Sequence, residues 1–101
     1  GYVMPELLPA TADGRVEDLP WERRANLAIV LAQTKHPDLA RPEVTFCLAE
    51  ADAERLRSLG PVSLFRLLTI ARAYHMDFTD PQLQKTALQL LPAEFQSQLG
   101  D

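Results

Sequence analysis

The chain has 101 residues, of which 47% are apolar, and a formal net charge of −4. This length fits one small domain, and the apolar content is too high for a disordered chain. The negative charge argues against a chain that grips a phosphate backbone alone, because non-specific affinity for nucleic acid comes mainly from cationic side chains.

The cysteine count and the hydropathy of the sequence further restrict the class of protein. The single cysteine excludes an internal disulfide and fits a reducing compartment. No apolar run approaches the roughly 20 residues that a membrane span needs, and no basic segment precedes an apolar one as in a signal peptide. We therefore expect a cytoplasmic protein that makes no membrane contact.

Residues 1–19 contain prolines, a glycine and no sustained hydrophobic period, which predicts an irregular N-terminal arm ahead of a helical domain over residues 20–101. The start at Gly1, with no initiator Met, suggests a trimmed chain. Two interpretations of the arm stay open, a loose end or a segment that docks through its apolar residues. Those residues are Tyr2, Val3, Met4, Leu7 and Leu8.

The first predicted helix spans residues 20–35. Pro20 suits a first helical turn, and Asp18 just before it suits the helix dipole. The segment from Ala25 to Ala32 is apolar around most of the helix, which indicates burial on more than one side. In so small a domain, that pattern favours a subunit interface. The His36-Pro37 dipeptide should end this helix, because the residue before proline avoids the α conformation.

Two short elements follow. Residues 41–48 predict a short helix or turn with three apolar side chains, and residues 50–59 predict an amphipathic helix. Ala53, Leu56 and Leu59 share one face of the latter. Gly60 should supply a left-handed residue after that helix, and Pro61 should stop it and open the next one.

The predicted helix over residues 62–76 is the central helix of the fold. Its polar residues recur at every third position and form one narrow stripe, and the rest of its surface is apolar. Asp80 is a plausible N-cap, with Pro81 in the first turn, for a further amphipathic helix over residues 81–91. Pro92 should break it, and residues 93–99 add a last turn or two. The fold class is thus all-α, a single domain of five or six short helices that forms dimers.

No catalytic or metal-ligating pattern stands out. The two histidines, His36 and His75, lie far apart, and with one cysteine neither has metal-ligand spacing around it. The run Glu50, Asp52, Glu54 opens a helix and should lie on its solvent side, and Cys47 should behave as a small buried hydrophobe. We therefore predict that the protein is not an enzyme and has no cofactor, metal site or small-molecule substrate.

Arginines give the more informative pattern. Acidic residues outnumber basic ones at both ends of the chain, whereas the middle is balanced and rich in arginine. Arginine suits interface ion pairs and phosphate contacts, although ordinary solvated helix faces would give the same pattern. The residues that could gather into a patch are Arg23, Arg24, Arg55, Arg57, Arg66 and Arg72. The last four are the predicted partner or phosphate contacts.

The stretch from Ala53 to Leu68 also has the outline of a helix-turn-helix, with a glycine in its turn. A DNA-reading unit should expose polar side chains at the start of its second helix, yet Ser63 alone could reach a base edge there. The better interpretation is that this stretch forms part of the hydrophobic core.

The run from Val44 to Leu68 resembles the central segment of FlhD, a subunit of the bacterial flagellar master transcription regulator. Apolar residues, an acidic helix start, a Pro-containing turn and a leucine-rich helix follow in the family's order. The matching residues are Val44, Phe46, Leu48, Glu50, Ala53, Leu56, Leu59, Pro61, Leu64, Arg66 and Leu67. Upstream, Asn26-Leu27 and Leu31-Ala32-Gln33 resemble the family's first helix. The family's turn glycine is Cys47 here, and its cysteine after the central helix falls near His75.

The resemblance implies a small, helical, dimeric, cytoplasmic regulator subunit that works with a zinc-binding, FlhC-like or other protein partner. Contact with nucleic acid would come only through that complex. The expected dimer core is Leu27, Val30, Leu31, Leu64, Phe65 and Leu68. The alternative is a helical interaction adaptor, a secretion chaperone or an antagonist of a regulator, with no DNA role. The sequence leaves open the target promoter, the partner, and activation versus repression.

Overall fold

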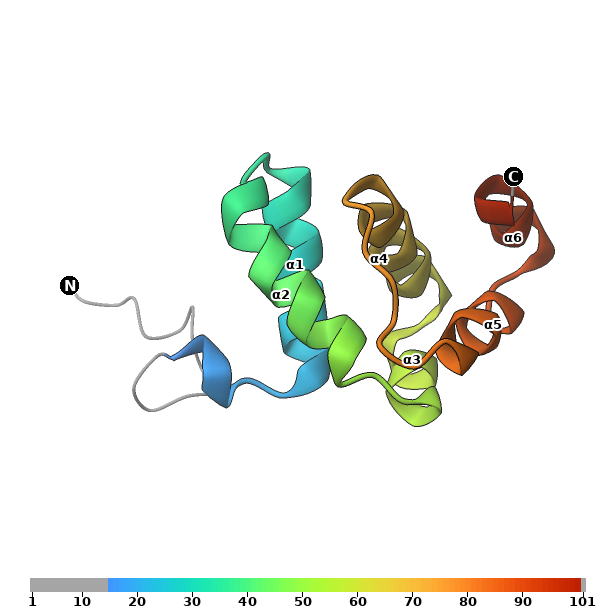
Figure 1. Cartoon of the computed structure of the whole chain (residues 1–101), viewed down its shortest axis with the longest axis horizontal. Coiled ribbons are helices and arrows are strands. Elements are labelled where there is room, and N and C mark those ends of the chain that lie inside the picture. The colour runs from blue at the N-terminus through green and yellow to red at the C-terminus, as the bar shows by residue number, and fades with distance from the viewer. Residues whose placement is uncertain (1–14, 101) are drawn as a thin grey trace.

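Six α-helices follow one another along residues 15–100, the part of the chain that the computed structural model describes (Figure 1). No strand occurs in this part, which confirms the predicted all-α class and a single helical domain. The elements are η2 (Val16–Asp18, a 3-10 turn), α1 (Trp21–Gln33), α2 (Pro37–Ala49), α3 (Ala53–Leu59), α4 (Pro61–Ala73), α5 (Gln82–Gln89) and α6 (Ala93–Gly100). Most of the predicted arm, residues 1–14, lies outside the described residues.

Helices α1 and α4 end in the same way. After α1, Lys35 takes a positive φ of 64°, and the backbone N–H of His36 donates to the Leu31 carbonyl at 2.8 Å. After α4, His75 has φ 59°, and the N–H of Met76 donates to Ala71 at 2.8 Å. Both are Schellman-type ends, a motif that usually places glycine at the left-handed position.

The predicted second helix was too short. Helix α2 begins at Pro37, ahead of the predicted start at Arg41, and it runs through Pro42. Pro37 occupies its first turn, where a missing N–H costs nothing, so this proline both ends α1 and opens α2. Pro42 is exposed and forfeits one internal hydrogen bond, which packing on α1 offsets.

Helix α3 also begins later than predicted, at Ala53, because Asp52 is its N-cap. The Asp52 Oδ1 accepts from the backbone N–H of Arg55 at 2.8 Å. Glu50 instead closes α2. At the start of α5, Asp80 Oδ1 accepts from the N–H of Gln82 at 3.0 Å, but the helix begins at Gln82 with Pro81 as its N-cap, one residue later than predicted.

The turn between α3 and α4 depends on Gly60. Its φ is 90° and its ψ is 156°, a positive-φ conformation that only glycine adopts readily, although it is not the left-handed helical one. A Cβ at this position would meet nothing within 4 Å, so the backbone conformation alone selects glycine. Leu64, Leu67 and Leu68 beyond the turn are buried, which confirms that this stretch builds the core.

The core lies where α1, α2, α3 and α4 meet, and the last third of the chain closes one side of it. Helix α1 packs mainly on α2 and α4, and α4 also contacts α3 and α6, so α4 is central as predicted. Phe78, in the loop after α4, and Ala87 and Leu91, from the α5 region, complete the core. In Figure 1 the pair α1–α2 and the pair α5–α6 lie on opposite sides of α4.

Candidate partner interface

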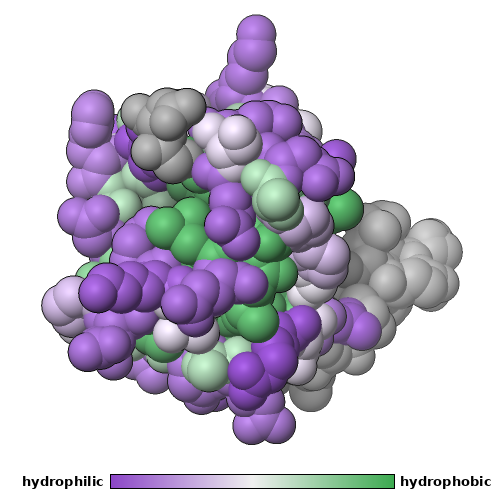
Figure 2. Space-filling model, turned by 90° about the vertical axis from the view of Figure 1, so that its right-hand side faces the viewer, coloured by the Kyte–Doolittle hydropathy of each residue, from purple (hydrophilic) through white to green (hydrophobic). Residues whose placement is uncertain are grey.

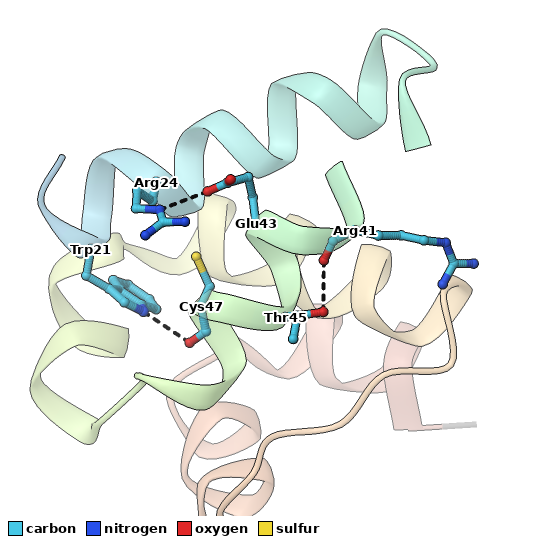
Figure 3. Close-up of polar contacts among 6 residues, drawn as sticks. All are labelled: Trp21, Arg24, Arg41, Glu43, Thr45 and Cys47. Carbon is cyan, nitrogen blue, oxygen red and sulfur yellow. Dashed lines mark hydrogen bonds and ion pairs between the residues drawn. The ribbon is translucent and has the colours of Figure 1, made fainter. Parts of the chain in front are cut away.

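The α1–α2 junction holds the most elaborate polar arrangement among the described residues (Figure 3). The indole Nε1 of Trp21, at the start of α1, donates to the carbonyl oxygen of Cys47 near the end of α2, at 3.0 Å. Trp21 is 6% exposed and Cys47 is fully buried. This hydrogen bond satisfies a buried donor and fixes the N-terminal end of α1 against α2.

One turn further along α1, Arg24 Nε donates to Glu43 Oε1 on α2 at 2.8 Å. The two side chains are only 11% and 15% exposed, and the Arg24 guanidinium lies 3.6 Å from the centre of the Phe46 ring. Arg24 was predicted as a possible member of a surface patch, and that prediction is wrong because the residue is only 9% exposed. Arg24 is a buried link between two helices, held by an ion pair and a cation–π contact.

Cys47 is not a reactive thiol in this setting. Burial raises its pKa from an ordinary value of 9.0 to about 12, the nearby Arg24 guanidinium lowers it in part, and the Glu43 carboxylate raises it further. A thiol with so high a pKa stays protonated at neutral pH and is a poor nucleophile. The prediction that Cys47 is a buried hydrophobe is confirmed.

The four arginines predicted as partner or phosphate contacts are all exposed, two on α3 and two on α4. Arg55 donates to the Glu50 carbonyl, and Arg72 donates to the Leu99 carbonyl of α6. The side chains of Arg57 and Arg66 make no ion pair or hydrogen bond among residues 15–100. Arg57 and Arg66 are therefore free to contact a partner, whereas Arg72 already holds α6.

The predicted dimer-core residues divide into two groups. Leu64 and Leu68 are 1% and 5% exposed, and Phe65 is partly buried against Phe95. These three side chains are packed within the chain's own core or against α6, so they offer little surface to a second subunit in this conformation.

The other three predicted dimer-core residues lie on α1 at i, i+3 and i+4, on one side of that helix. Val30 is 52% exposed, and Leu27 and Leu31 are partly exposed. We call these three residues the α1 stripe. Helix α1 was expected to be buried on more than one side, yet among residues 15–100 full burial is limited to the side that carries Ala25, Ala28 and Ile29. Within that part of the chain, the α1 stripe is an apolar surface that is only partly covered.

A shallow hollow of about 510 Å³ separates the start of α1 from α3. Trp21 lies at its edge, and Glu22, Asp52 and Glu54 give it an acidic lining that Arg55 partly offsets. Among residues 15–100 no group of three His, Cys, Asp or Glu side chains could hold a metal ion. Within those same residues no helix is both long enough and apolar enough to cross a membrane.

Comparison of the chain with protein-family models, with curated proteins and with solved structures finds no match.

Sequence reasoning missed the link between Arg24 and Glu43. The two residues are 19 positions apart and belong to different helices, so no local spacing relates them. The one available signal was that Arg24 falls on the same side of α1 as Trp21, Ala25 and Ala28, the side that a helical period assigns to the core.

Proposed function

We propose that the protein is an FlhD-like subunit of a cytoplasmic transcription regulator, which acts by homodimerisation and by binding a DNA-binding partner protein. The observation that carries this proposal is the α1 stripe: Leu27, Val30 and Leu31 form an apolar surface, most exposed at Val30, that residues 15–100 leave partly open. Uncovered apolar surface on a small acidic domain marks a protein–protein interface.

The FlhD-like segments also occupy one continuous part of the fold. The run from Val44 to Leu68 supplies the end of α2, all of α3 and the first half of α4, and the upstream match lies in α1. These helices pack on one another around the core.

The net charge supports a secondary role for this subunit in DNA binding. The chain carries a net charge of −4, which disfavours tight binding to a phosphate backbone by this subunit alone. The exposed Arg55, Arg57 and Arg66 would then contact the partner, or the phosphates once the partner holds the complex on DNA. Arg72 belongs to this set only if α6 releases it.

The second candidate function is a helical adaptor, chaperone or antagonist without a DNA role. The acidic hollow between α1 and α3 favours it, because Glu22, Asp52 and Glu54 suit a basic segment of a partner better than they suit nucleic acid.

Homodimerisation is tested by measuring the mass of the protein in solution by light scattering over a range of concentrations. We expect a dimer that Val30→Glu converts to a monomer, because a charge would be buried in the apolar contact. The matched control is Gln89→Glu, at an exposed site on α5, which should stay dimeric. A wild-type protein that is monomeric at all concentrations would exclude this part of the proposal.

The partner and the DNA role are tested together. A tagged form of the protein is used to capture its partner from the source lysate, and retention of the complex on DNA is measured as salt rises. We expect a partner with a cysteine-rich zinc pattern and a retention that falls steeply with salt. Arg55→Glu with Arg57→Glu should weaken complex or DNA binding without unfolding the protein. A complex that never retains DNA favours the adaptor instead.

A further inference from the structure

Helix α6 is the most lightly held helix in the structure. None of the side chains described on it is buried, in contrast to each of the other five α-helices. Its inner side consists of Phe95 and Leu99, spaced i and i+4 on one face. The Phe95 ring stacks on Phe65 of α4, with centroids 4.4 Å apart and an angle of 19° between the planes.

The second attachment of α6 is polar. A guanidinium nitrogen of Arg72 donates to the backbone carbonyl of Leu99, at the C-terminal end of α6. The last carbonyls of a helix have no partner within the helix, and the negative end of the helix dipole lies there, so a cation is well placed. The contacts Phe65–Phe95 and Arg72–Leu99 therefore attach both halves of α6 to α4.

Helix α6 does not fill the surface on which it lies. A pocket of about 250 Å³ remains between α4, the loop after it, α5 and the end of α6. Its lining is mainly apolar, and Arg72 and Asp77 lie among the polar residues on it. The apolar residues that line it are Leu48, Leu68, Ala71, Met76, Phe78, Leu88 and Leu99. Figure 2 shows hydrophobic residues at the surface of this side of the molecule, framed by hydrophilic side chains.

We call this pocket and the α4 surface under α6, with Phe65 and Arg72, the acceptor groove. The groove has the parts that recognise one amphipathic helix: an aromatic platform, an apolar pocket, and an arginine for the helix C-terminus. Helix α6 contacts all three, through Phe95, Leu99 and the Leu99 carbonyl, and it leaves part of the pocket open.

The segment that joins α5 to α6 would permit α6 to leave the groove. Helix α5 ends at Gln89 and α6 begins at Ala93, and Pro92 between them interrupts the helical hydrogen bonds. Leu91 is buried and anchors α5 on the core, so the chain can pivot after it without disturbing the core. The contact of Gln96 Nε2 with the Leu91 carbonyl, at 2.8 Å, is the local hydrogen bond that such a pivot breaks.

We propose that α6 is a displaceable cover on a helix-acceptor groove, and that an amphipathic helix of a partner protein replaces it. The incoming helix carries an aromatic and a long aliphatic side chain at i and i+4, and it presents its C-terminal carbonyls to Arg72. Displacement of α6 by such a helix would couple partner binding to release of the C-terminal segment. This inference does not depend on the proposed regulatory function, because any partner helix of this pattern would do.

The test uses the full chain and a fluorescein-labelled peptide of residues 92–100 as the probe. Binding is measured by fluorescence polarisation, with the wild type and with a Phe95→Ala, Leu99→Ala variant whose own α6 has lost its anchors. Because an internal competitor reduces the apparent affinity by the fraction of open protein, we expect the variant to bind the peptide about tenfold more tightly than the wild type. Circular dichroism verifies that the variant remains folded.

Two controls separate binding in the acceptor groove from non-specific hydrophobic binding of the peptide. A Ser97→Ala, Gln98→Ala variant alters exposed residues of α6 and should bind the peptide as the wild type does. A peptide with alanine in place of Phe95 and Leu99 should bind neither protein. Equal binding to wild type and variant, or no binding by a folded variant, would overturn the proposal. So would a wild-type dimer that the Phe95→Ala, Leu99→Ala variant abolishes, because the occupant would then be α6 of a second copy.

Discussion

The α1–α2 pair and the α5–α6 pair flank the same central helix but are held by different means. Between α1 and α2, an indole hydrogen bond, a nearly buried ion pair and a cation–π contact lie around a fully buried Cys47. Helix α6 has one ring stack, one arginine contact to a carbonyl, one hydrogen bond from the Gln96 side chain to the Leu91 carbonyl and no buried side chain among those described. Specific buried polar contacts fix one arrangement, whereas a few partly exposed contacts leave alternatives open.

The largest effect should come from breaking the Arg24–Glu43 ion pair that joins α1 to α2. Arg24→Met removes one partner of the ion pair and leaves the Glu43 carboxylate nearly buried without its cation, so we expect a loss of about 3 kcal/mol in the free energy of unfolding. The measurement is urea denaturation followed by circular dichroism. Arg23→Met, at the exposed neighbouring position, should change stability by less than about 0.5 kcal/mol. An Arg24→Met effect as small as that of the control would mean that the ion pair does not hold the helices.

Leucine truncation compares the two regions directly. Leu67 is fully buried, and its change to Ala should cost about 3 kcal/mol because a cavity remains in the packed core. Leu99 is partly exposed on α6, and its change to Ala should cost less than about 1 kcal/mol. Both variants are measured by the same denaturation experiment. Similar losses at the two sites would contradict the contrast between a packed core and a lightly held α6.

The thiol of Cys47, buried at the α1–α2 junction, should make the free energy of unfolding depend on pH. The native pKa of Cys47 is raised to about 12, so the unfolded chain ionises first as pH rises above about 9. The stabilisation is therefore complete below pH 9 and is lost as pH rises toward 12, by roughly 1 kcal/mol for each pH unit.

The measurement is the free energy of unfolding from pH 8 to 11, compared between the wild type and Cys47→Ala, which removes the contribution of other titrating groups. Parallel curves for the two proteins would show that Cys47 is not buried in its protonated form.

The smallest expected effect concerns the ends of α1 and α4. Lys35 and His75 both occupy left-handed positions that cost a side chain about 1 kcal/mol relative to glycine. Lys35→Gly and His75→Gly should each raise stability by about 1 kcal/mol or slightly less, seen as a rise in Tm. Lys85→Gly, in the interior of α5, should lower it by a similar amount. A gain at one helix end alone would mean that the two ends differ in more than their backbone.

Local rules predicted much of this fold. The positive-φ turn at Gly60, the central helix and the burial of Cys47 all follow from residues close together in the chain. The start of α2 was missed because Pro37 satisfies two rules at once, ending one helix and opening another. The role of Arg24 was missed because its partner is on another helix, and only packing brings the two together. The exposure of the α1 stripe likewise depends on which neighbours the fold supplies.

Trp21 is the one tryptophan of the chain, and it is buried at the junction of α1 and α2. Its intrinsic fluorescence therefore reports the environment of the α1–α2 junction. It should be insensitive to detachment of α6, which lies on the other side of α4. A thermal melt followed at the indole emission maximum would register loss of the core while missing any earlier departure of the C-terminal helix. Fluorescence alone would make two successive transitions resemble one, and a label near Phe95 would be needed to separate them.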